Sequence, residues 1–538
     1  MGKLRILLVL GVLCCGCGRV VPVDGPVSVV PAPVNVTPAE GVFRLSASTR
    51  VVVRSADERM SFVTDALGDV LRPIFGRRLT VCPAAPAQDG AVNFIGTDSI
   101  PSDGYSLTIA PDRIEVLSGG PEGAFYAVQT LRQLLPAAAF GAGRVKAVEL
   151  PAVVVEDRPG MGYRGMMLDV ARHFFTVEEV KRVLDLLALH KMNVFHWHLT
   201  EGLGWRVEIK QYPLLTQKGA YAAVGEEQQG FYSQEEIKAL VDYAAARNIT
   251  IVPEIDMPGH AEAALHSYPE LGCFNRPVEI PKLGFTPNIF CAGKENTLQF
   301  LKNVLDEICT LFPSPYIHLG GDEAPKDNWN KCPDCQKRIA DLGLKDSHDL
   351  QLWFSAQMAE YLKSKGKKAI FWGDVVYNDG YPLPENIVIQ WWNYRGHKDL
   401  ALRNALHHHY PVICSTNYYT YLNFPLTPWK GYEQARTFDL KDVYIDNPSY
   451  KATQESNPLI RGMGCALWTD DGVKEYMIDR RLFPRILALA EQMWHNGPLT
   501  DFDTFYQRIL HKKEWFENRG YSFGPALTEE TDNNYKWE

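Results

Sequence analysis

Short apolar runs alternate with amphipathic stretches along most of the chain beyond residue 160. The runs are rich in β-branched and aromatic residues, have the length of buried strands, and lie at 163–170, 193–199, 249–257, 316–323, 368–376, 387–392, 410–415 and 463–470. Two of the stretches between them open with the spacing of a capping box, Thr176 with Glu179 and Ser233 with Glu236. Continuous apolar runs fit parallel strands that are covered on both faces. The pattern therefore predicts an α/β fold, a (β/α)8 TIM barrel over residues 158–497.

The chain before the barrel has a different pattern. Strand-like runs lie at 50–54, 91–95, 105–109 and 113–117, and one helical stretch covers 123–135. This pattern predicts a small α+β domain over residues 36–157. The turn residues Arg158, Pro159 and Gly160 mark its end. After the barrel, Phe502, Phe505, Tyr506 and Ile509 have helical spacing, so we expect residues 498–538 to form a helical tail.

The first residues have the features of a targeting segment. Residues 1–17 combine a basic start, a short apolar run and an exit rich in small residues, which is typical of a secretion signal. The run ends in a cysteine cluster that resembles a bacterial lipobox, with Cys17 as the predicted lipid-bearing residue and Cys14 or Cys15 as alternatives. An ordinary cleaved signal is the other interpretation. The proline-rich residues 18–35 are predicted to be an extended tether between the anchor and the fold. We expect an exported protein that is lipid-anchored to a bacterial membrane, on the periplasmic face or the cell surface.

Composition narrows the range of partners. The chain has 538 residues, 64 acidic against 55 basic side chains and a net charge of −9, and it has no basic stripe to neutralise phosphates. Nucleic acid is therefore an unsuitable partner. With 46% hydrophobic and 22% charged residues, the body of the chain has the composition of a globular protein, and only a lipid anchor would bring it to a membrane.

Eight cysteines follow the N-terminal cluster, too few for the disulfide framework of a large domain. Cys332 and Cys335 form the only close pair. Zinc is the weaker interpretation, because the sequence near this pair offers no second pair and no His-x-His arrangement. We expect a local loop disulfide or two free thiols, and no metal or organic cofactor.

Polar and aromatic residues gather where the predicted barrel strands end. They are Asp169, Arg172, His196, His198, Glu254, Asp256, His260, His318, Asp322, Glu323, Trp372, Asp374, Trp391, Trp392, Trp468 and Asp470. Barrel enzymes build their active sites at the carboxyl ends of the strands. Tryptophan offers a flat apolar face to a sugar ring and carboxylates accept hydrogen bonds from its hydroxyls, so this set favours a carbohydrate site.

The strongest single motif is His318-Leu319-Gly320-Gly321-Asp322-Glu323. Two glycines after a strand allow close backbone approach and deliver adjacent carboxylates to the barrel mouth. Glycoside cleavage needs a carboxylic acid that protonates the leaving oxygen and a second group that stabilises the positive anomeric carbon. An exposed turn with two solvated acids is the alternative interpretation of the motif alone.

These motifs together resemble family 20 of the glycoside hydrolases, the β-N-acetylhexosaminidases. The resemblance rests on 318–323 and on Pro253-Glu254-Ile255-Asp256-Met257-Pro258-Gly259-His260, with Tyr163-Arg164-Gly165, His196-Trp197-His198-Leu199-Thr200, Gly204-Trp205-Arg206 and Leu467-Trp468-Thr469 in the expected order. It covers nearly all of the mature chain. It implies a small α+β domain before a TIM barrel, and substrate-assisted catalysis in which the 2-acetamido oxygen of the sugar is the nucleophile.

The resemblance also implies roles for individual residues. Glu323 matches the general acid/base, and Asp322 matches the residue that orients the acetamido group. The matching substrate-binding residues are Arg164 for the ring hydroxyls, His260 as support of the acid/base, Trp372, Trp392 and Trp468 as aromatic walls, and Tyr421 for the acetamido carbonyl. Trp391 is an alternative to Trp392, and Tyr418 or Tyr419 to Tyr421.

Three positions depart from the family pattern. The chain has Glu201-Gly202-Leu203-Gly204-Trp205 where the family usually has Asp-Asp-Gln-Gly-Trp, so Glu201 is an uncertain partner for His260. Asn423 stands in place of Asp, and Asp470 in place of a Glu that contacts the hydroxyls at positions 4 and 6. The shorter Asp470 suggests either a 6-modified sugar, for example a 6-sulfate paired with Lys474 or Lys430, or ordinary variation between gluco and galacto preference. We favour the second.

The sequence thus predicts an exo-acting, retaining β-N-acetylhexosaminidase that removes terminal N-acetylglucosamine or N-acetylgalactosamine from glycans. A glycan-binding protein with impaired turnover is an alternative, because the stretch at 201–203 is altered. A disaccharide-releasing enzyme of the same family is another.

Overall fold

The computed structural model describes residues 19–83, 85–141, 143, 145–221, 229–280, 285–424, 440–470, 472–495 and 497–524. The chain divides into two compact units: one holds the residues up to 28 together with 35–156, and the other holds 29–34 together with the chain from 157 onward. The predicted signal segment with Cys17 lies outside the described residues. Within them, no helix is both long and apolar enough to cross a membrane.

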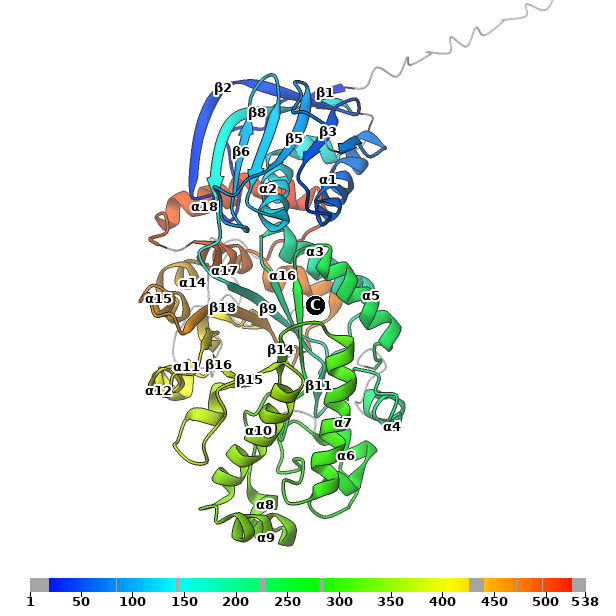
Figure 1. The fold of residues 1–538 in the computed structure, drawn as a ribbon, viewed down its shortest axis with the longest axis vertical. Helices are drawn as coiled ribbons and strands as arrows, with labels where there is room; N and C mark the ends of the chain where they lie inside the picture. The colour runs from blue at the N-terminus through cyan, green and yellow to red at the C-terminus, as the bar shows by residue number, and fades with distance from the viewer. Residues whose placement is uncertain are drawn as a thin grey trace, which may run out of the picture. The chain divides into compact units, whose positions relative to one another are not determined.

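The first unit is a mixed sheet with two helices. Its strands follow the order β1-β8-β6-β7-β5-β3-β4, and β2 pairs with β8. The strands are β1 Arg19–Val21, β2 Asn35–Ser46, β3 Arg50–Arg54, β4 Thr80–Pro83, β5 Ala91–Gly96, β6 Tyr105–Ile109, β7 Ile114–Ser118 and β8 Val145–Asp157. The helices are α1 Met60–Phe75 and α2 Pro121–Leu134. Helix α2 packs on β6 and β7, and α1 packs on α2 (Figure 1).

The prediction of a free tether over residues 18–35 is wrong for the described part of that segment. Strand β1 pairs in parallel with β8. In the second unit, the Val29 and Val30 side chains are buried and the Ala32 N–H donates to the Glu491 carboxylate at 2.8 Å. The prolines set an extended backbone, but the valines between them supply apolar surface that packs against the folded chain.

The second unit is the predicted TIM barrel. Eight parallel strands close in the order β10-β13-β14-β15-β16-β17-β18-β9. They are β9 Tyr163–Asp169, β10 Val194–His198, β13 Thr250–Glu254, β14 Tyr316–His318, β15 Lys368–Trp372, β16 Ile387–Trp391, β17 Val412–Cys414 and β18 Ile460–Leu467. The short pair β11 Thr200–Glu201 and β12 Gly204–Trp205 follows β10. Each predicted apolar run overlaps one barrel strand, although β18 begins three residues before its run, and the fold prediction is confirmed.

Helices lie outside the barrel strands, as α3, α5, α7 and α10 show in Figure 1. The helices of this unit are α3 Val177–Leu189, α4 Leu214–Gln217, α5 Gln234–Ala245, α6 Glu262–Ser267, α7 Glu295–Leu311, α8 Asp327–Lys331, α9 Pro333–Leu342, α10 Ser347–Ser364, α11 Tyr394–His397, α12 Leu400–His407, α13 Asn417–Thr420, α14 Leu440–Asp446, α15 Pro448–Thr453, α16 Ile478–Leu482, α17 Arg485–Trp494 and α18 Phe502–Glu517. Thr176 caps α3 through the Glu179 N–H, and Ser233 with Glu236 forms the predicted capping box of α5. In the tail helix α18, Phe505 and Ile509 are buried.

The interior of the barrel changes character along its axis. Near the amino ends of the strands, apolar side chains pack together: Tyr163, Val194, Val252, Ile370, Val388 and Ile413. At the carboxyl ends, buried polar residues replace them, among them His196, Glu254 and His318. The apolar layer closes one end of the barrel, so the strands present their chemistry at the other end.

Candidate active site

A buried hydrogen-bond network fills the barrel just below its mouth. Glu254, at the end of β13, accepts through Oε1 from Trp372 Nε1 at 2.8 Å. Its Oε2 lies 2.7 Å from both His196 Nε2 and His198 Nδ1, and His318 Nδ1 is 3.2 Å from Oε1. Burial alone would raise the pKa of Glu254, but the three histidines hold it well below its usual range. These strand-end residues therefore support the floor of the site and do not line its cavity.

The Gly320-Gly321 turn brings the paired carboxylates to the mouth. Gly320 and Gly321 have φ values of 63° and 94°, a region that favours glycine. A Cβ on Gly320 would lie 1.8 Å from Asp256 Oδ1, and the Gly321 N–H donates to that same oxygen at 3.1 Å. The turn therefore fits only without side chains, and it delivers Asp322 and Glu323 above Asp256.

His260 lies beside both carboxylates. Its Nε2 is 3.7 Å from Glu323 Oε2 and 3.9 Å from Asp322 Oδ2. On the other side of the ring, Nδ1 is 2.6 Å from Glu201 Oε1. Glu201 therefore is the partner of His260, although the sequence departs from the family pattern at this position.

Glu201 also fixes an arginine at the site. Arg172 donates to Asp169 Oδ2 at 3.1 Å, and its Nη2 lies 3.0 Å from Glu201 Oε2. The guanidinium stands over the Trp468 ring, 5.0 Å from its centroid. Since two buried carboxylates and an aromatic face hold it, Arg172 presents its remaining donors in a fixed orientation.

The assignment of Arg164 to the sugar hydroxyls is wrong. Arg164 is the second residue of β9, so it lies at the amino end of the barrel, whereas Arg172 follows the carboxyl end of the same strand. The Arg164 guanidinium donates to the backbone oxygens of Lys191 at 2.9 Å and Met161 at 2.6 Å, and it is buried there. The sequence already places Arg172 among the residues that follow predicted strands. That position, after the strand and not at its start, distinguishes Arg172 from Arg164 as the arginine of the site.

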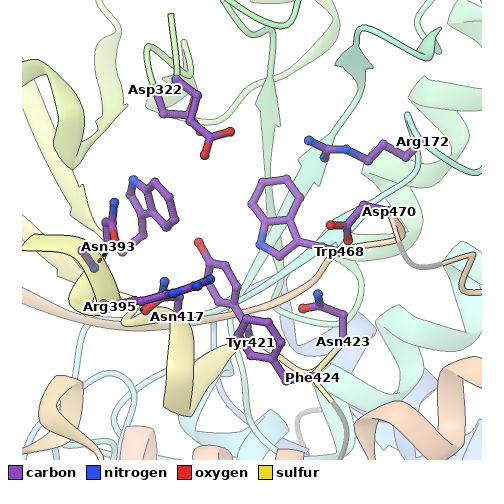
Figure 2. A pocket seen from close by; sticks show the side chains of 13 residues that line it. Arg172, Asp322, Asn393, Arg395, Asn417, Tyr421, Asn423, Phe424, Trp468 and Asp470 are labelled. Carbon is purple, nitrogen blue, oxygen red and sulfur yellow. Dashed lines mark hydrogen bonds between the residues drawn. The ribbon is translucent and has the colours of Figure 1, made fainter. Parts of the chain in front are cut away.

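A cavity of about 490 Å³ opens above these groups (Figure 2). Its lining combines three carboxylates, two arginines, amides and aromatic rings: Arg172, Asp322, Glu323, Trp392, Asn393, Arg395, Gly396, Asn417, Tyr421, Asn423, Phe424, Trp468 and Asp470. Figure 2 shows Asp322, Arg172, Trp468 and Tyr421 around one opening. A volume of this size is within the range of small-molecule sites, roughly 300–1,000 Å³.

Three aromatic side chains form the walls of this cavity. The Trp392 and Tyr421 rings are nearly parallel, at 7° with centroids 6.4 Å apart, and Trp468 lies 5.9 Å from Tyr421. Trp372 is buried behind Trp468, 5.8 Å away, and is not among the lining residues. Trp391 donates from Nε1 to the Lys398 oxygen, outside this lining, so Trp392 is the wall residue of the pair.

Asp374 is a further acid at the site. Its Oδ2 accepts from Trp392 Nε1 at 2.7 Å, and its Oδ1 accepts from the Glu323 N–H at 3.4 Å. It thus links one wall to the backbone of the acid pair. The sequence placed Asp374 at a strand end, but nothing in the sequence specified these two contacts.

Burial and neighbouring charges set the protonation of the central groups. Burial raises the pKa of Glu323, and Asp374 adds to that rise, while His260 opposes it. Burial and the Asp256 carboxyl raise the pKa of Asp322 well above its usual range. Burial would lower the pKa of His260, but the Glu201 carboxylate raises it well above its usual range. Neighbouring charge thus favours the charged form of His260, whereas burial favours the neutral forms of Asp322 and Glu323.

Two of the three departures from the family pattern line the cavity. Asn423 and Asp470 both belong to the lining. Burial would lower the pKa of the Arg172 guanidinium, but Glu201, Asp169 and the nearby Asp470 raise it above its usual range. Of the two lysines considered for a sulfate, Lys474 is not a lining residue and Lys430 lies outside the described residues. Arg395 also lines the cavity, although no sequence motif indicated it.

Comparison with known proteins agrees with this geometry. The model of the glycosyl hydrolase family 20 catalytic domain matches residues 161–497, and the model of domain 2 of the same family matches residues 27–158. The chain belongs to glycosyl hydrolase family 20. It is therefore a glycoside hydrolase with the barrel and preceding domain of that family.

Individual members of family 20 resemble the chain over most of its length. A β-N-acetylhexosaminidase structure from Bacteroides fragilis is 56% identical with a TM-score of 0.87, over 95% of this chain and 100% of that one. A mutant Streptomyces plicatus β-hexosaminidase in complex with the product GlcNAc is 30% identical with a TM-score of 0.81, over 94% and 97% of the two chains. The β-hexosaminidase of Porphyromonas gingivalis is 35% identical over 94% of this chain, which spans 65% of that relative's length.

Proposed function

We propose that this protein is an exo-acting, retaining β-N-acetylhexosaminidase that hydrolyses terminal non-reducing N-acetylglucosamine or N-acetylgalactosamine from glycans by substrate-assisted catalysis. One observation carries the proposal. Asp322 Oδ1 is buried and has no hydrogen-bond partner among the described residues, directly beside the acid Glu323. A buried acceptor without a donor is costly, so its natural complement is an N–H brought by the substrate. The N–H of a 2-acetamido group is such a donor.

The other side of the cavity fits the same substrate. Tyr421 lines it, and burial, with the nearby Asp322 carboxyl, raises the pKa of its hydroxyl well above the usual range. A neutral hydroxyl donates a hydrogen bond, and the acetamido carbonyl oxygen accepts one. Held between Asp322 and Tyr421, the acetamido oxygen attacks the anomeric carbon of its own sugar, which makes the step intramolecular.

Glu323 supplies the proton that this attack requires. In the first step it protonates the glycosidic oxygen, the bond to the leaving group breaks, and a cyclic oxazolinium forms with the acetamido oxygen bound to the anomeric carbon. In the second step the Glu323 carboxylate takes a proton from water, and the water oxygen opens the ring on the same face. The anomeric configuration is retained because it inverts twice. No step uses a metal or organic cofactor.

The position of Glu201 argues against the alternative of a glycan-binding protein with impaired turnover. That alternative rested on the altered stretch at 201–203, yet Glu201 Oε1 contacts His260 at 2.6 Å. The longer side chain keeps the carboxylate against the histidine. The acid pair and its support are therefore complete.

The test is turnover of an aryl β-N-acetylglucosaminide and its galacto epimer by the wild type beside Glu323→Gln and Asp322→Asn. The wild type is expected to release the chromophore, and Glu323→Gln to lower kcat by about 10²–10⁴-fold, the usual contribution of a general acid. Glu360→Gln, an exposed position on α10, is the matched control and keeps wild-type rates. Binding of a 2-acetamido glycan without cleavage would refute the proposal, and release of disaccharides from an aryl disaccharide substrate would refute its exo-monosaccharide form.

Export and anchoring are part of this proposal. Residues 1–17 have the order of a lipoprotein signal, with Cys17 as the lipid-bearing residue, and they support attachment to a bacterial membrane on the periplasmic face or the cell surface. From there the barrel would reach terminal sugars of mucins, N-glycans or chitin fragments, with no nucleic acid partner. Palmitate labelling of wild type and Cys17→Ala tests the anchor, and equal labelling of the two would contradict it.

A further inference from the structure

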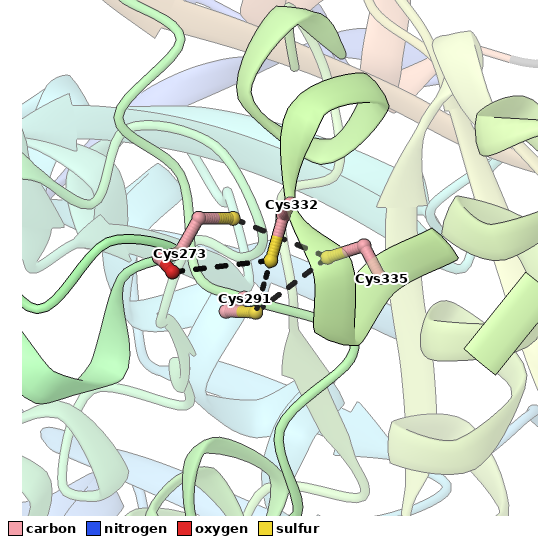
Figure 3. Close-up of side chains that lie close together, drawn as sticks. All are labelled: Cys273, Cys291, Cys332 and Cys335. Atoms are coloured by element: carbon pink, nitrogen blue, oxygen red, sulfur yellow. Dashed lines mark hydrogen bonds between the residues drawn. The ribbon is translucent and has the colours of Figure 1, made fainter. Parts of the chain in front are cut away.

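Four cysteines converge outside the cavity (Figure 3). Of the two expectations for Cys332 and Cys335, a loop disulfide or two free thiols, the structure has free thiols. Cys332 and Cys335 meet Cys273 and Cys291, and all four sulfurs lie within 4.8 Å of one another. The sequence could not reveal the second pair, because its two members lie more than 40 residues before the first and are separated from each other.

The local backbone positions each sulfur. Cys273 and Cys291 are on two segments joined by an antiparallel bridge between Gly272 and Phe290, and the Cys291 N–H donates to the Leu271 oxygen at 2.9 Å. Cys332 is the N-cap of α9 and Cys335 lies in its first turn. A two-residue spacing at a helix start turns both sulfurs to the same side.

A close approach of the two segments completes the cluster. A Cβ added to Gly293 would lie 2.2 Å from the Asp334 carbonyl carbon and 2.3 Å from the Cys335 nitrogen. Only glycine allows the turn after Cys291 to lie against the start of α9. Cys291, Cys332 and Cys335 are fully buried, and Cys273 is 9% exposed.

The sulfur separations fit metal coordination. They are 3.5 Å for Cys291–Cys335, 3.7 Å for Cys291–Cys332 and 4.0 Å for Cys273–Cys335. A tetrahedron of sulfurs about 2.3 Å from a central Zn²⁺ has edges of about 3.8 Å. A disulfide needs sulfurs about 2.05 Å apart and joins them only in pairs, whereas here Cys291 and Cys335 each have two near neighbours.

The surroundings suit a negatively charged centre. Four thiolates around Zn²⁺ carry a net charge of −2. The Gly293 N–H donates to the Cys291 sulfur, and the amino end of α9 directs its partial positive charge at Cys332 and Cys335. Two cations hold the same turns: Lys294 Nζ donates to the Gly272 oxygen at 2.5 Å, and Arg338 to the Gly293 oxygen at 3.2 Å.

We propose that Cys273, Cys291, Cys332 and Cys335 bind one structural Zn²⁺ through four thiolates. All-sulfur donors in a tetrahedral arrangement favour zinc or iron over the hard cations magnesium and calcium. Four protein ligands leave no open position, which is the arrangement of a structural site and not of a catalytic one. Each thiol that binds releases its proton to solvent, and no oxidation is involved.

The four cysteines lie on the two loops that carry His260 and Glu323. Cys273 and Cys291 lie on the connection between β13 and α7, which carries His260, and Cys332 and Cys335 lie on the connection between β14 and α10, which carries Glu323. The same two connections meet at the 3.7 Å contact between His260 and Glu323. Zinc would therefore join the two loops that form the acid site. This consequence for activity rests on the proposed function, whereas the metal site itself does not.

The test is metal analysis of the full chain, produced with zinc in the medium and purified in a phosphine reductant. The expected result is one zinc per chain by elemental mass spectrometry, with an X-ray absorption spectrum of four sulfur neighbours at about 2.3 Å. Cys335→Ser and Cys291→Ser should lose the metal. Cys414→Ser, at a buried free thiol in the barrel strand β17, is the matched control and should keep it.

Measurements on the wild type keep the proposal falsifiable if the variants do not fold. Peptide mapping after alkylation should show these four thiols protected until a chelator is added, and replacement by Co²⁺ should give the visible bands of a tetrahedral thiolate centre. Chain without zinc, chain with iron in its place, or disulfides among the four cysteines would each overturn the proposal. Metal content needs no substrate, so failure of the glycosidase proposal would leave this result unaffected.

Discussion

Glu201 holds His260 with one carboxylate oxygen and Arg172 with the other. Oε1 lies 2.6 Å from His260 Nδ1 and Oε2 lies 3.0 Å from Arg172 Nη2, with the Glu201 side chain 4% exposed. One buried carboxylate therefore orients both the histidine beside the acid pair and the arginine in the cavity wall. Burial would raise the pKa of Glu201, but Arg172 and His260 hold it well below its usual range.

Glu201→Gln keeps the shape of this side chain and removes its charge. The Arg172 and His260 charges then lose a buried partner, which should lower the free energy of unfolding by about 3 kcal/mol. Denaturant unfolding measures this loss, and kcat/KM should fall with it. Glu201→Asp keeps the charge and should recover part of both quantities. A Glu201→Gln variant with wild-type stability and activity beside an impaired Glu201→Asp would show that side-chain length and not charge is what matters.

The two arginines of the β9 region should respond differently to the same substitution. Arg172→Lys removes the planar set of guanidinium donors from the cavity wall. The transition state should lose about 2 kcal/mol of stabilisation, so kcat/KM should fall roughly thirtyfold. Arg164→Lys breaks hydrogen bonds to the Lys191 and Met161 oxygens, so it should lower the melting temperature and leave KM unchanged. Michaelis–Menten kinetics and thermal melts of both variants check this. A larger KM for Arg164→Lys than for Arg172→Lys would contradict the placement.

The pH dependence of kcat/KM should report Glu323. Glu323 must be protonated to act as the acid, and its pKa is raised from that of an ordinary glutamic acid. A raised pKa keeps the proton at higher pH, so activity should persist above the ordinary glutamate range and fall as pH rises through the raised value. Glu323→Gln should remove this limb, and its residual activity should be greatest on substrates whose leaving group needs no proton. If the loss of activity at high pH persists in Glu323→Gln, that loss reports the titration of another group.

Asp470 should disfavour a 6-sulfated sugar. Its carboxylate lines the cavity, and by the family resemblance this position contacts the hydroxyls at positions 4 and 6. An anion next to a sulfate is repelled, so the aryl 6-sulfo-N-acetylglucosaminide should be cleaved more slowly than its unsulfated counterpart. Asp470→Asn should narrow the ratio of the two rates, and Asp470→Glu should not. Faster cleavage of the sulfated substrate by the wild type would contradict this and would point to Arg395 as the cation.

Gly320→Ala should abolish activity for a steric reason. An alanine Cβ would lie 1.8 Å from Asp256 Oδ1, so the turn that carries Asp322 and Glu323 must move. Gly366→Ala separates this effect from backbone strain: its φ of 73° is similar, yet no atom lies within 4 Å of the added Cβ. That control should cost about 1 kcal/mol of stability and keep full activity. Turnover and melting temperature of the two variants give the comparison, and an active Gly320→Ala would show that the turn has room.

The sequence by itself determined the barrel and its acid pair. Apolar runs of strand length and capping residues such as Thr176 act over a few neighbouring residues, so local pattern specifies them. The two glycines before Asp322 likewise predict a tight turn at the end of a strand. The multi-residue motifs that resemble family 20 indicated the family for the same reason, since each is contiguous in the chain.

Only the tertiary structure decided which side chains meet. Arg164 lies at the start of β9 and Arg172 just past its end, and with a rise of about 3.3 Å per residue the two ends of the strand lie at opposite ends of the barrel. Whether Glu201 reaches His260 depends on how two separate loops approach. The sulfurs of Cys273 and Cys335 come from residues 62 positions apart, and chain closure brings them within 4.0 Å. Such contacts depend on packing between distant segments, which no local pattern of residues records.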